Sequence, residues 1–429
     1  MLTYYIVFAI SIACLVLAEK LEQKNKDIAV AIKILAIFIP ALLAGMRAID
    51  VGTDTKLYIE PAFNDAVNAT DFSAFYKMYD IEPLYMLFTF VCAKIFANVN
   101  VFMTALYFII TLLAYKIAKD NSDKAPLSIT YAVFLLFYFN KSLNLVRQTI
   151  SILLVIYGLK YVKNKKYTKS IAIILVSILI HKTAIIGALI YLIYGIFDKK
   201  NTKYYKIIIL VVSALFLIVY KPLLNFLIND IHVLNSRYNY YINSNKVDVS
   251  LSYMLFNLLL LIWSLTFYKK LVKHDKFNEY LVFIVILGNI LMLLSTQFNF
   301  VIRISYYFTY LYLLIIPEMV EIYDTNKKKL ITAIAMLTIF GAYNYIYYGY
   351  QQNDKTCPYK SIFNNKNNSI NKQGDDLLQE NKVNENENEP LNDNDDNVND
   401  ELNNEDNNNL ELEEVKNNGK IGEYNNTII

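Results

Sequence analysis

Three ionisable side chains interrupt stretches of sequence that are otherwise apolar. Arg147 lies in FNKSLNLVRQTISILL, Arg303 in VIRISYYFTYLY and His181 in SILIHKTAII. An ionisable group at the depth of a lipid bilayer costs free energy unless it faces a partner or a polar cavity, so such residues are functional candidates by default. Arginine offers paired donors to phosphate oxygens, and a neutral histidine can accept a proton. Together they suit the binding of a phosphate group, such as the diphosphate that some membrane lipids carry.

A polar stretch, AGMRAIDVGTDTKLY (44–58), directly follows an apolar run. It contributes Arg47 as a further phosphate-binding candidate and Asp54 as an acidic candidate, and Gly52 gives the backbone room to turn between them. Asp50 and Asp54 are four residues apart, which is typical of loop solvation or helix capping. Only this spacing supports the alternative of a glycosidase-type carboxylate pair. A plain loop that ends a helix is the alternative.

Each candidate also has a purely structural interpretation. Arg147 would close a hydrogen bond within a helix bundle, Arg303 would anchor a helix end among interfacial tyrosines, and His181 would be a satisfied bundle histidine. The tyrosine-rich stretches are typical either of an interfacial belt or of platforms on which sugars stack. The sequence has no HExxH motif, histidine cluster, P-loop or GxGxxG motif, so neither a metal nor another cofactor is predicted.

The elements that position these residues follow from composition. The chain has 429 residues, of which 55% are hydrophobic and 18% charged. Soluble domains carry about a quarter charged residues, and the apolar residues here gather in runs of about 15–20, the length of a membrane-crossing helix. We therefore expect an all-α, polytopic integral membrane bundle with no nucleic-acid partner. The first run, 2–18, lacks the basic start and cleavage site of a signal peptide and is expected to be retained as a span.

About twelve transmembrane helices are expected from these runs. A further stretch, 83–97, is apolar but short, so it is predicted to be re-entrant or to lie along the interface. The expected spans are 2–18, 28–46, 99–117, 125–140, 142–162, 168–181, 183–197, 204–221, 251–267, 279–296, 304–321 and 330–348.

Lysine placement predicts the orientation of the spans. The alternate connections 19–27, 116–124, 160–169, 199–206, 269–276 and 327–329 hold 22 lysines, which places them in the cytoplasm by the positive-inside rule. Both termini then lie outside, provided that 83–97 does not cross. The polar candidates all fall on the outer side: Arg47, Asp50, Asp54, Glu60, Glu82, Arg147, His181, Lys182, Arg237 and Arg303. The stretch 168–197 is read as two short helices that meet at His181 in a recessed pocket.

Charge divides the chain into two unlike parts. From residue 364 to the end there are 17 acidic and 5 basic residues, a net charge of −12, whereas the rest carries +15. An asparagine-rich, acidic segment with few aromatic residues cannot bury a core, so we expect a disordered tail. The predicted division is a transmembrane body (1–350), a short outer-face segment (351–363) and the tail (364–429).

Six motifs occur in a fixed order along the chain: RAIDVGTDTKLY (47–58), EPLY (82–85), FNKSLNLVRQTIS (139–151), HKTA (181–184), RISYY (303–307) and PYKSIF (358–363). Together they resemble the EpsG family, Wzy-like membrane proteins of bacterial exopolysaccharide and capsule clusters. The resemblance covers roughly residues 1–363. The acidic tail has no counterpart in the family pattern.

The resemblance implies polymerisation of polyprenyl-diphosphate-linked oligosaccharide repeats on the outer face of the bacterial inner membrane, by glycosyl transfer without a metal. It assigns Arg47, Arg147 and Arg303 to the diphosphate, with Gln148 beside them in the substrate-binding set. Asp54 or His181 would deprotonate the acceptor hydroxyl, and Tyr58 and Glu82 would orient the sugar or the loop. The implied partners are the lipid-linked oligosaccharide, membrane lipid and other proteins of polysaccharide assembly and export.

Other functional classes stay open at this point. A flippase for the same lipid-linked glycan would need charged residues through the membrane midplane and inverted repeats, and neither is recognisable in the sequence. A non-catalytic partner that scaffolds an export complex is a second alternative. A membrane acyltransferase would need an acidic or amide neighbour for its histidine, whereas His181 is followed by Lys182 and Thr183.

Overall fold

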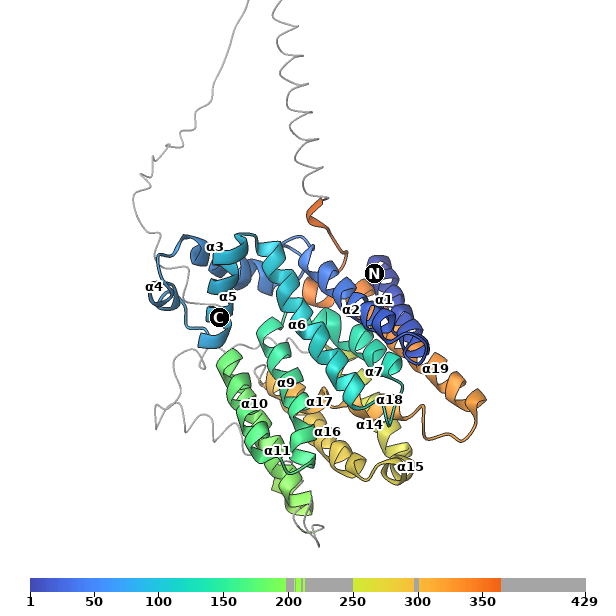
Figure 1. Cartoon of the computed structure of the whole chain (residues 1–429). Coiled ribbons are helices and arrows are strands. Elements are labelled where there is room, and N and C mark those ends of the chain that lie inside the picture. The colour runs from blue at the N-terminus through green and yellow to red at the C-terminus, as the bar shows by residue number, and fades with distance from the viewer. Residues whose placement is uncertain (198–203, 205, 210, 213–249, 297–300, 364–429) are drawn as a thin grey trace, which may run out of the picture. The chain divides into compact units, whose positions relative to one another are not determined.

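The computed structural model describes residues 1–197, 204, 206–209, 211, 212, 250–296 and 301–363 (Figure 1). Within these residues the chain forms helices and their connections without a β-strand, apart from one isolated antiparallel bridge between Arg47 and Ser361. The all-α prediction is confirmed for this part of the chain. Arg237, most of the expected span 204–221 and the acidic tail lie outside the described residues.

The described helices follow the apolar runs closely. They are α1 (Leu2–Leu21), α2 (Lys26–Gly45), α3 (Glu60–Asn68), α4 (Phe72–Tyr76), α5 (Pro83–Phe96), α6 (Val99–Asp120), α7 (Leu127–Val133), α8 (Phe139–Ser142), α9 (Val146–Lys163), α10 (Tyr167–Ile180), α11 (Ile185–Phe197), α14 (Leu251–Thr266), α15 (Tyr268–His274), α16 (Phe277–Leu294), α17 (Val301–Thr309), α18 (Tyr312–Glu318) and α19 (Asn326–Asn344). Three π-helical turns adjoin these helices: Thr55–Ile59 before α3, Phe134–Tyr138 between α7 and α8, and Tyr345–Tyr350 after α19.

Several of these helices have the length and composition needed to cross a bilayer. Five described helices qualify, namely α1, α2, α6, α16 and α19 with its π-turn, and a sixth qualifies if α14 and α15 form one span with a 68° bend. The helices α5 and α10, and the segment Lys182–Phe197 that contains α11, are apolar but shorter. The chain is therefore a multi-pass helical membrane protein. The described residues contain five or six candidate spans. The twelve spans expected from the sequence stay a prediction.

The first helices show how the sequence builds this bundle. The side chain of Asn25 caps α2 by accepting from the Ile28 amide at 3.1 Å, which satisfies a donor that the helix leaves free. In the contact between α1 and α2, the hydroxyl of Ser11 donates to the Ala36 carbonyl at 2.6 Å. Gly45 at the end of α2 lets Thr104 of α6 approach so closely that a Cβ would overlap its hydroxyl. Small residues at such contacts are the usual device of membrane helices.

Helix α9 packs against α6, α10, α11 and α17 (Figure 1). Its 18 residues give it a length of about 27 Å. Val146 begins the helix and Lys163 ends it, so the residues around Arg147 and the lysine-rich connection after Lys163 lie at opposite ends of one rod. That these two ends lie on opposite sides of the membrane stays a prediction of the lysine distribution.

Two interruptions of the helices matter for the site. The expected break at His181 is present, because α10 ends at Ile180 and His181 has an extended backbone with φ −155° and ψ 115°. The expected continuous span 304–321 is instead divided into α17 and α18. At that break the Leu313 amide bonds to Tyr310, and the Thr309 carbonyl accepts from the buried Tyr138 hydroxyl at 3.1 Å.

The orientation can be tested with two exposed lysines, Lys56 in the polar loop and Lys169 in α10. We expect a single cysteine at Lys56 to react with a membrane-impermeant maleimide added to intact cells, and a cysteine at Lys169 to react only after the membrane is opened. The background chain carries alanine in place of Cys14, Cys92 and Cys357. Reversed accessibility of the two positions would place the polar loop in the cytoplasm.

Candidate functional site

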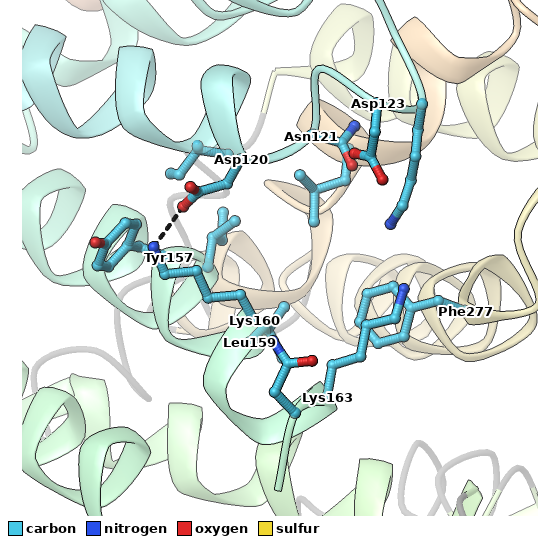
Figure 2. A pocket seen from close by; sticks show the side chains of 13 residues that line it. Asp120, Asn121, Asp123, Tyr157, Leu159, Lys160, Lys163 and Phe277 are labelled. Carbon is cyan, nitrogen blue, oxygen red and sulfur yellow. Dashed lines mark hydrogen bonds and ion pairs between the residues drawn. The ribbon is translucent and has the colours of Figure 1, made fainter. Parts of the chain in front are cut away.

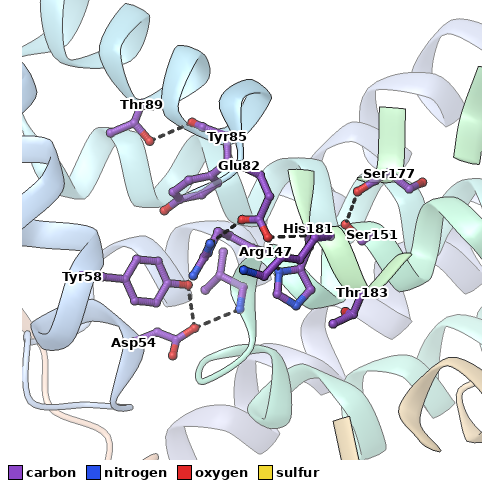
Figure 3. Close-up of polar contacts among 12 residues, drawn as sticks. Asp54, Tyr58, Glu82, Tyr85, Thr89, Arg147, Ser151, Ser177, His181 and Thr183 are labelled. Carbon is purple, nitrogen blue, oxygen red and sulfur yellow. Dashed lines mark hydrogen bonds and ion pairs between the residues drawn. The ribbon is translucent and has the colours of Figure 1, made fainter. Parts of the chain in front are cut away.

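Five of the predicted site residues lie together at the beginning of α9. Asp54 and Tyr58 come from the loop and π-turn after α2, Glu82 directly precedes α5, Arg147 is in the first turn of α9, and His181 separates α10 from the next helix (Figure 3). Residues 54 and 181 are thus far apart in sequence but share one cluster. We call these five residues the polar cluster.

The strongest contact of the polar cluster joins Arg147 to Glu82. Arg147 Nη1 lies 2.5 Å from Glu82 Oε2, and the two side chains are only 11% and 10% exposed. The guanidinium also lies over the rings of Tyr58 and Tyr85, 4.7 and 5.6 Å from their centroids. A buried guanidinium is tolerated only with such compensation, so this pair explains how an arginine can begin an apolar helix.

The second oxygen of Glu82 serves the histidine. Glu82 Oε1 accepts from the Lys182 amide at 2.9 Å and lies 3.2 Å from His181 Nδ1. Burial disfavours its charged form, but the contacts with His181 and the charge of Arg147 outweigh burial and lower the pKa of Glu82 to about 2. Glu82 is therefore a carboxylate at neutral pH that connects the arginine to the histidine.

His181 is placed to act as a proton acceptor. Its side chain is 12% exposed, and burial lowers its pKa below the ordinary value despite the neighbouring Glu82, so the ring is neutral at pH 7. Among the described residues neither ring nitrogen makes a hydrogen bond: Nδ1 has only the 3.2 Å contact with Glu82 Oε1, and Nε2 has no partner. In the tautomer that carries its proton on Nδ1, toward Glu82, Nε2 has the free lone pair. A buried ring nitrogen without a partner is a group that a ligand could satisfy.

Asp54 stands at the other side of Arg147. Its Oδ2 accepts from the Tyr58 hydroxyl at 2.8 Å and from the Val146 amide, the first of α9, at 3.2 Å. Burial raises the pKa of Asp54 to about 6, although both hydrogen bonds and the charge of Arg147 act to lower it. A carboxylate at a helix N-terminus is favoured by the helix dipole, so Asp54 holds the polar loop against α9.

The other predicted residues lie around the cluster in different ways. Gln148 donates from Nε2 to the Arg303 carbonyl at 2.6 Å, which ties α9 to α17. The Arg303 side chain is exposed and makes no ion pair within the described part of the chain, yet it is close enough to favour the charged form of Asp54 and the neutral form of His181. It is the arginine of the site with the most accessible charge.

Arg47 lies away from solvent, in the interior of the protein. It is completely buried, and it donates to the Val51 carbonyl at 3.1 Å, to the Ala44 carbonyl at 2.5 Å and to the Thr55 hydroxyl at 2.7 Å. Its guanidinium lies over the ring of Tyr107 at 4.7 Å. In this arrangement Arg47 shapes the loop that carries Asp54. A role in binding the diphosphate stays a prediction that these contacts do not favour.

The spacing of Asp50 and Asp54 does not produce a carboxylate pair. The Asp50 side chain is 50% exposed and forms an ion pair with Lys360, whereas Asp54 is buried against Tyr58 and α9. Of the other candidates, Glu60 is half-buried in α3 and Lys182 is exposed. Sequence reasoning passed over Tyr85 and Tyr307, although both lie inside motifs that it had singled out. Tyr85 lies over Arg147, and the Tyr307 hydroxyl is 3.1 Å from that of Thr183 beside His181.

A second polar feature lies at the far end of α9. Asp120, Asp123, Lys124, Lys160 and Lys163 line a cavity of about 250 Å³ (Figure 2). The lysines are all paired: Lys160 with Asp120 at 2.6 Å, and Lys124 and Lys163 with Asp275 at 2.5 and 3.1 Å. Because these charges compensate one another, the cavity offers no excess charge to a ligand. No group of three His, Cys, Asp or Glu side chains arranged for a metal occurs in the described residues.

Comparison with known proteins gives one result. The family model of the EpsG family matches residues 30–361, which includes every residue of the polar cluster. No curated protein and no solved structure matches the chain.

Gly52 provides a test of how the polar loop is held. Its φ is +81°, and a Cβ there would lie 2.8 Å from Asn144 Oδ1 and 3.0 Å from the Leu143 carbonyl. We expect Gly52→Ala to destabilise the protein by about 1 kcal/mol or more, since both the positive φ and the contact oppose a side chain. The measurement is the thermal denaturation midpoint in detergent. Gly195→Ala in α11, where a Cβ meets nothing within 4 Å, is the matched control, and an equal effect of both changes would contradict the interpretation.

Proposed function

The chain belongs to the EpsG family, and from this premise we propose that it is a Wzy-like polymerase that joins polyprenyl-diphosphate-linked oligosaccharide repeats into exopolysaccharide or capsule. The reaction is placed on the outer face of the bacterial cell membrane, with both termini of the chain outside. One observation carries the proposal beyond family membership: Glu82 contacts both a buried arginine and a neutral histidine. A cation for a phosphate leaving group and a base for a hydroxyl thus lie side by side.

The proposed step is a single displacement. A hydroxyl oxygen of the acceptor sugar attacks the anomeric carbon of the growing glycan, and the bond from that carbon to the diphosphate oxygen breaks. The electron pair leaves with the polyprenyl diphosphate, and the hydroxyl proton passes to the base. Negative charge therefore develops on the leaving diphosphate, where arginine side chains stabilise it.

The arginines divide this task according to their surroundings. Arg303 is exposed and free of an ion pair within the described residues, so we assign it the first contact with the diphosphate. Arg147 is already paired with Glu82 at 2.5 Å, so it contributes the positive field beside the leaving group, and it holds Glu82 in place. The hydrogen bond from Gln148 to the Arg303 carbonyl holds the beginning of α9 beside α17, and with them the two arginines.

His181 is the better candidate for the base. Its Nε2 has no partner within the described part of the chain, and the Glu82 carboxylate lies 3.2 Å from its other nitrogen, where a tightened contact would orient the ring as a general base. Asp54 has its Oδ2 occupied by Tyr58 and the Val146 amide, which suits a residue that positions the loop. A non-catalytic scaffold or a flippase would not need an oriented histidine of this kind.

Turnover of a purified lipid-linked repeat unit tests the proposal. We expect the full-length protein to produce a ladder of glycan lengths on a gel, and His181→Ala and Arg147→Ala each to slow its formation about a hundredfold or more, the usual contribution of a general base or of an oriented charge. Asp120→Asn, which alters only the ion pair with Lys160 at the other end of α9, is the control and should retain activity. Full activity of His181→Ala in a folded protein would remove the histidine from the mechanism.

The pH dependence separates the two candidate bases. Activity should decline toward acid pH as the base takes up a proton. The decline should lie near pH 6 if the base is Asp54 and below the ordinary imidazole range if it is His181, whose pKa burial lowers. Glu82→Gln removes the charge that raises the pKa of His181, so the pKa falls further and the unprotonated ring persists to lower pH. In this variant we expect lower activity and a decline shifted to lower pH. A decline that stays near pH 6 would indicate Asp54 as the titrating group.

A further inference from the structure

The chain returns to the polar loop after its last described helix. Residues 351–363, which we call the strap, follow α19 and its π-turn. Three backbone hydrogen bonds join the strap to the loop. The Ile362 amide donates to the Met46 carbonyl at 3.1 Å, the Ala48 amide to the Lys360 carbonyl at 2.8 Å, and the Gly52 amide to the Lys355 carbonyl at 2.9 Å. Segments about 310 residues apart in sequence therefore lie against each other.

The strap is held in a conformation that it would not adopt by itself. Gln352, Asp354 and Lys355 have φ values of +52°, +63° and +51°. Residues other than glycine adopt such values at a cost, and they persist only where surrounding contacts impose them. The contacts of Asp354 are those that impose them here.

Asn144 connects the strap to the residue next to Asp54. Its Nδ2 donates to the Asp354 carbonyl at 2.6 Å, and its Oδ1 accepts from the Thr53 amide, also at 2.6 Å. Two residues later the Val146 amide donates to Asp54 itself. One side chain thus fixes the strap, the loop and the beginning of α9 relative to one another.

Lys141 holds Asp354 of the strap through its side chain. Its Nζ lies 2.9 Å from Asp354 Oδ2 and 3.2 Å from the Tyr347 hydroxyl, and its side chain is 9% exposed. The rings of Tyr253, Tyr306 and Tyr347 surround the ammonium at 5.2, 5.7 and 5.3 Å from their centroids. A lysine enclosed by three aromatic rings and paired with one carboxylate has a single favourable position.

We propose that Lys141 and Asn144 are positioning residues for the polar cluster, acting through the strap to hold Asp54 against α9. Neither residue touches the substrate in this proposal. Lys141 fixes Asp354, Asp354 presents its carbonyl to Asn144, and Asn144 fixes the Thr53 amide and with it Asp54. The link to catalysis rests on the proposed function, whereas the link between strap and loop does not.

The experiment measures the loop and the reaction separately, in the full-length chain. A cysteine at Thr53, with alanine in place of Cys14, Cys92 and Cys357, reports the exposure of the loop by its rate of reaction with a maleimide. We expect Asn144→Ala to raise this rate about tenfold, because two half-buried hydrogen bonds are lost. In the polymerisation assay, without the added cysteine, the same change should lower kcat about tenfold and leave KM within about twofold, since the loop and not the substrate contact is altered.

A double-mutant cycle identifies the shared route. If Lys141→Met and Asn144→Ala act through the same strap, the double variant should label no more than about twofold faster than the faster single variant. Multiplied effects would mean independent roles and overturn the proposal. Lys163→Met removes a lysine from the pair with Asp275 at the other end of α9. It is the matched control, and an equal gain in labelling there would show general loosening and also overturn the proposal.

The two proposals fail in different ways. An unchanged labelling rate in Asn144→Ala would contradict the strap, whatever the activity. Absence of a glycan ladder from the unsubstituted chain, with a matched repeat unit and an active positive control, would contradict the proposed function and leave the labelling result as the test of the strap.

Discussion

The structure of the site depends on how the positive charge of Arg147 is compensated. A guanidinium in the first turn of an apolar helix is unstable without a partner of opposite charge, and Glu82 supplies that partner from a segment about 65 residues away in sequence. Because Glu82 has two oxygens, the same carboxylate also lies 3.2 Å from the His181 ring. The requirement of one buried charge therefore brings together α5, α9 and the junction after α10.

The charges of the site are nearly balanced before any substrate arrives. Arg147 is offset by Glu82, and Arg303 lies close enough to Asp54 to favour its ionised form. A balanced site binds a diphosphate less tightly than a cluster of unpaired arginines would. That property suits a polymerase, since the polyprenyl diphosphate must leave after each addition, and binding that favours the transition state over the ground state accelerates the reaction.

Sequence reasoning predicted the helices and the members of the site better than their contacts. Arg147 and His181 were recognisable because each interrupts an apolar run, and the break at His181 appeared at the expected residue. The burial of Arg47 was not recognisable, because its partners are two nearby backbone carbonyls, the Thr55 hydroxyl and the ring of Tyr107, and no motif shows that these groups meet. The contacts of Glu82 with both Arg147 and His181, and the division of 304–321 into two helices, likewise depend on tertiary contacts. A sequence motif gives the order of residues along the chain but not which of them meet in the fold.

The strap has a consequence for how the protein matures. Its residues follow every described helix of the membrane body, yet their backbone completes the loop that holds Asp54. Chains emerge from the ribosome in order, and their early parts fold first. A nascent chain whose first helices have already inserted therefore contains the arginines, the histidine and the lipid-facing surface, but its polar loop lacks the final support. Under the two proposals, the site is complete only after α19 and the strap have been made, so an incomplete chain in the membrane would lack the activity proposed for the whole protein.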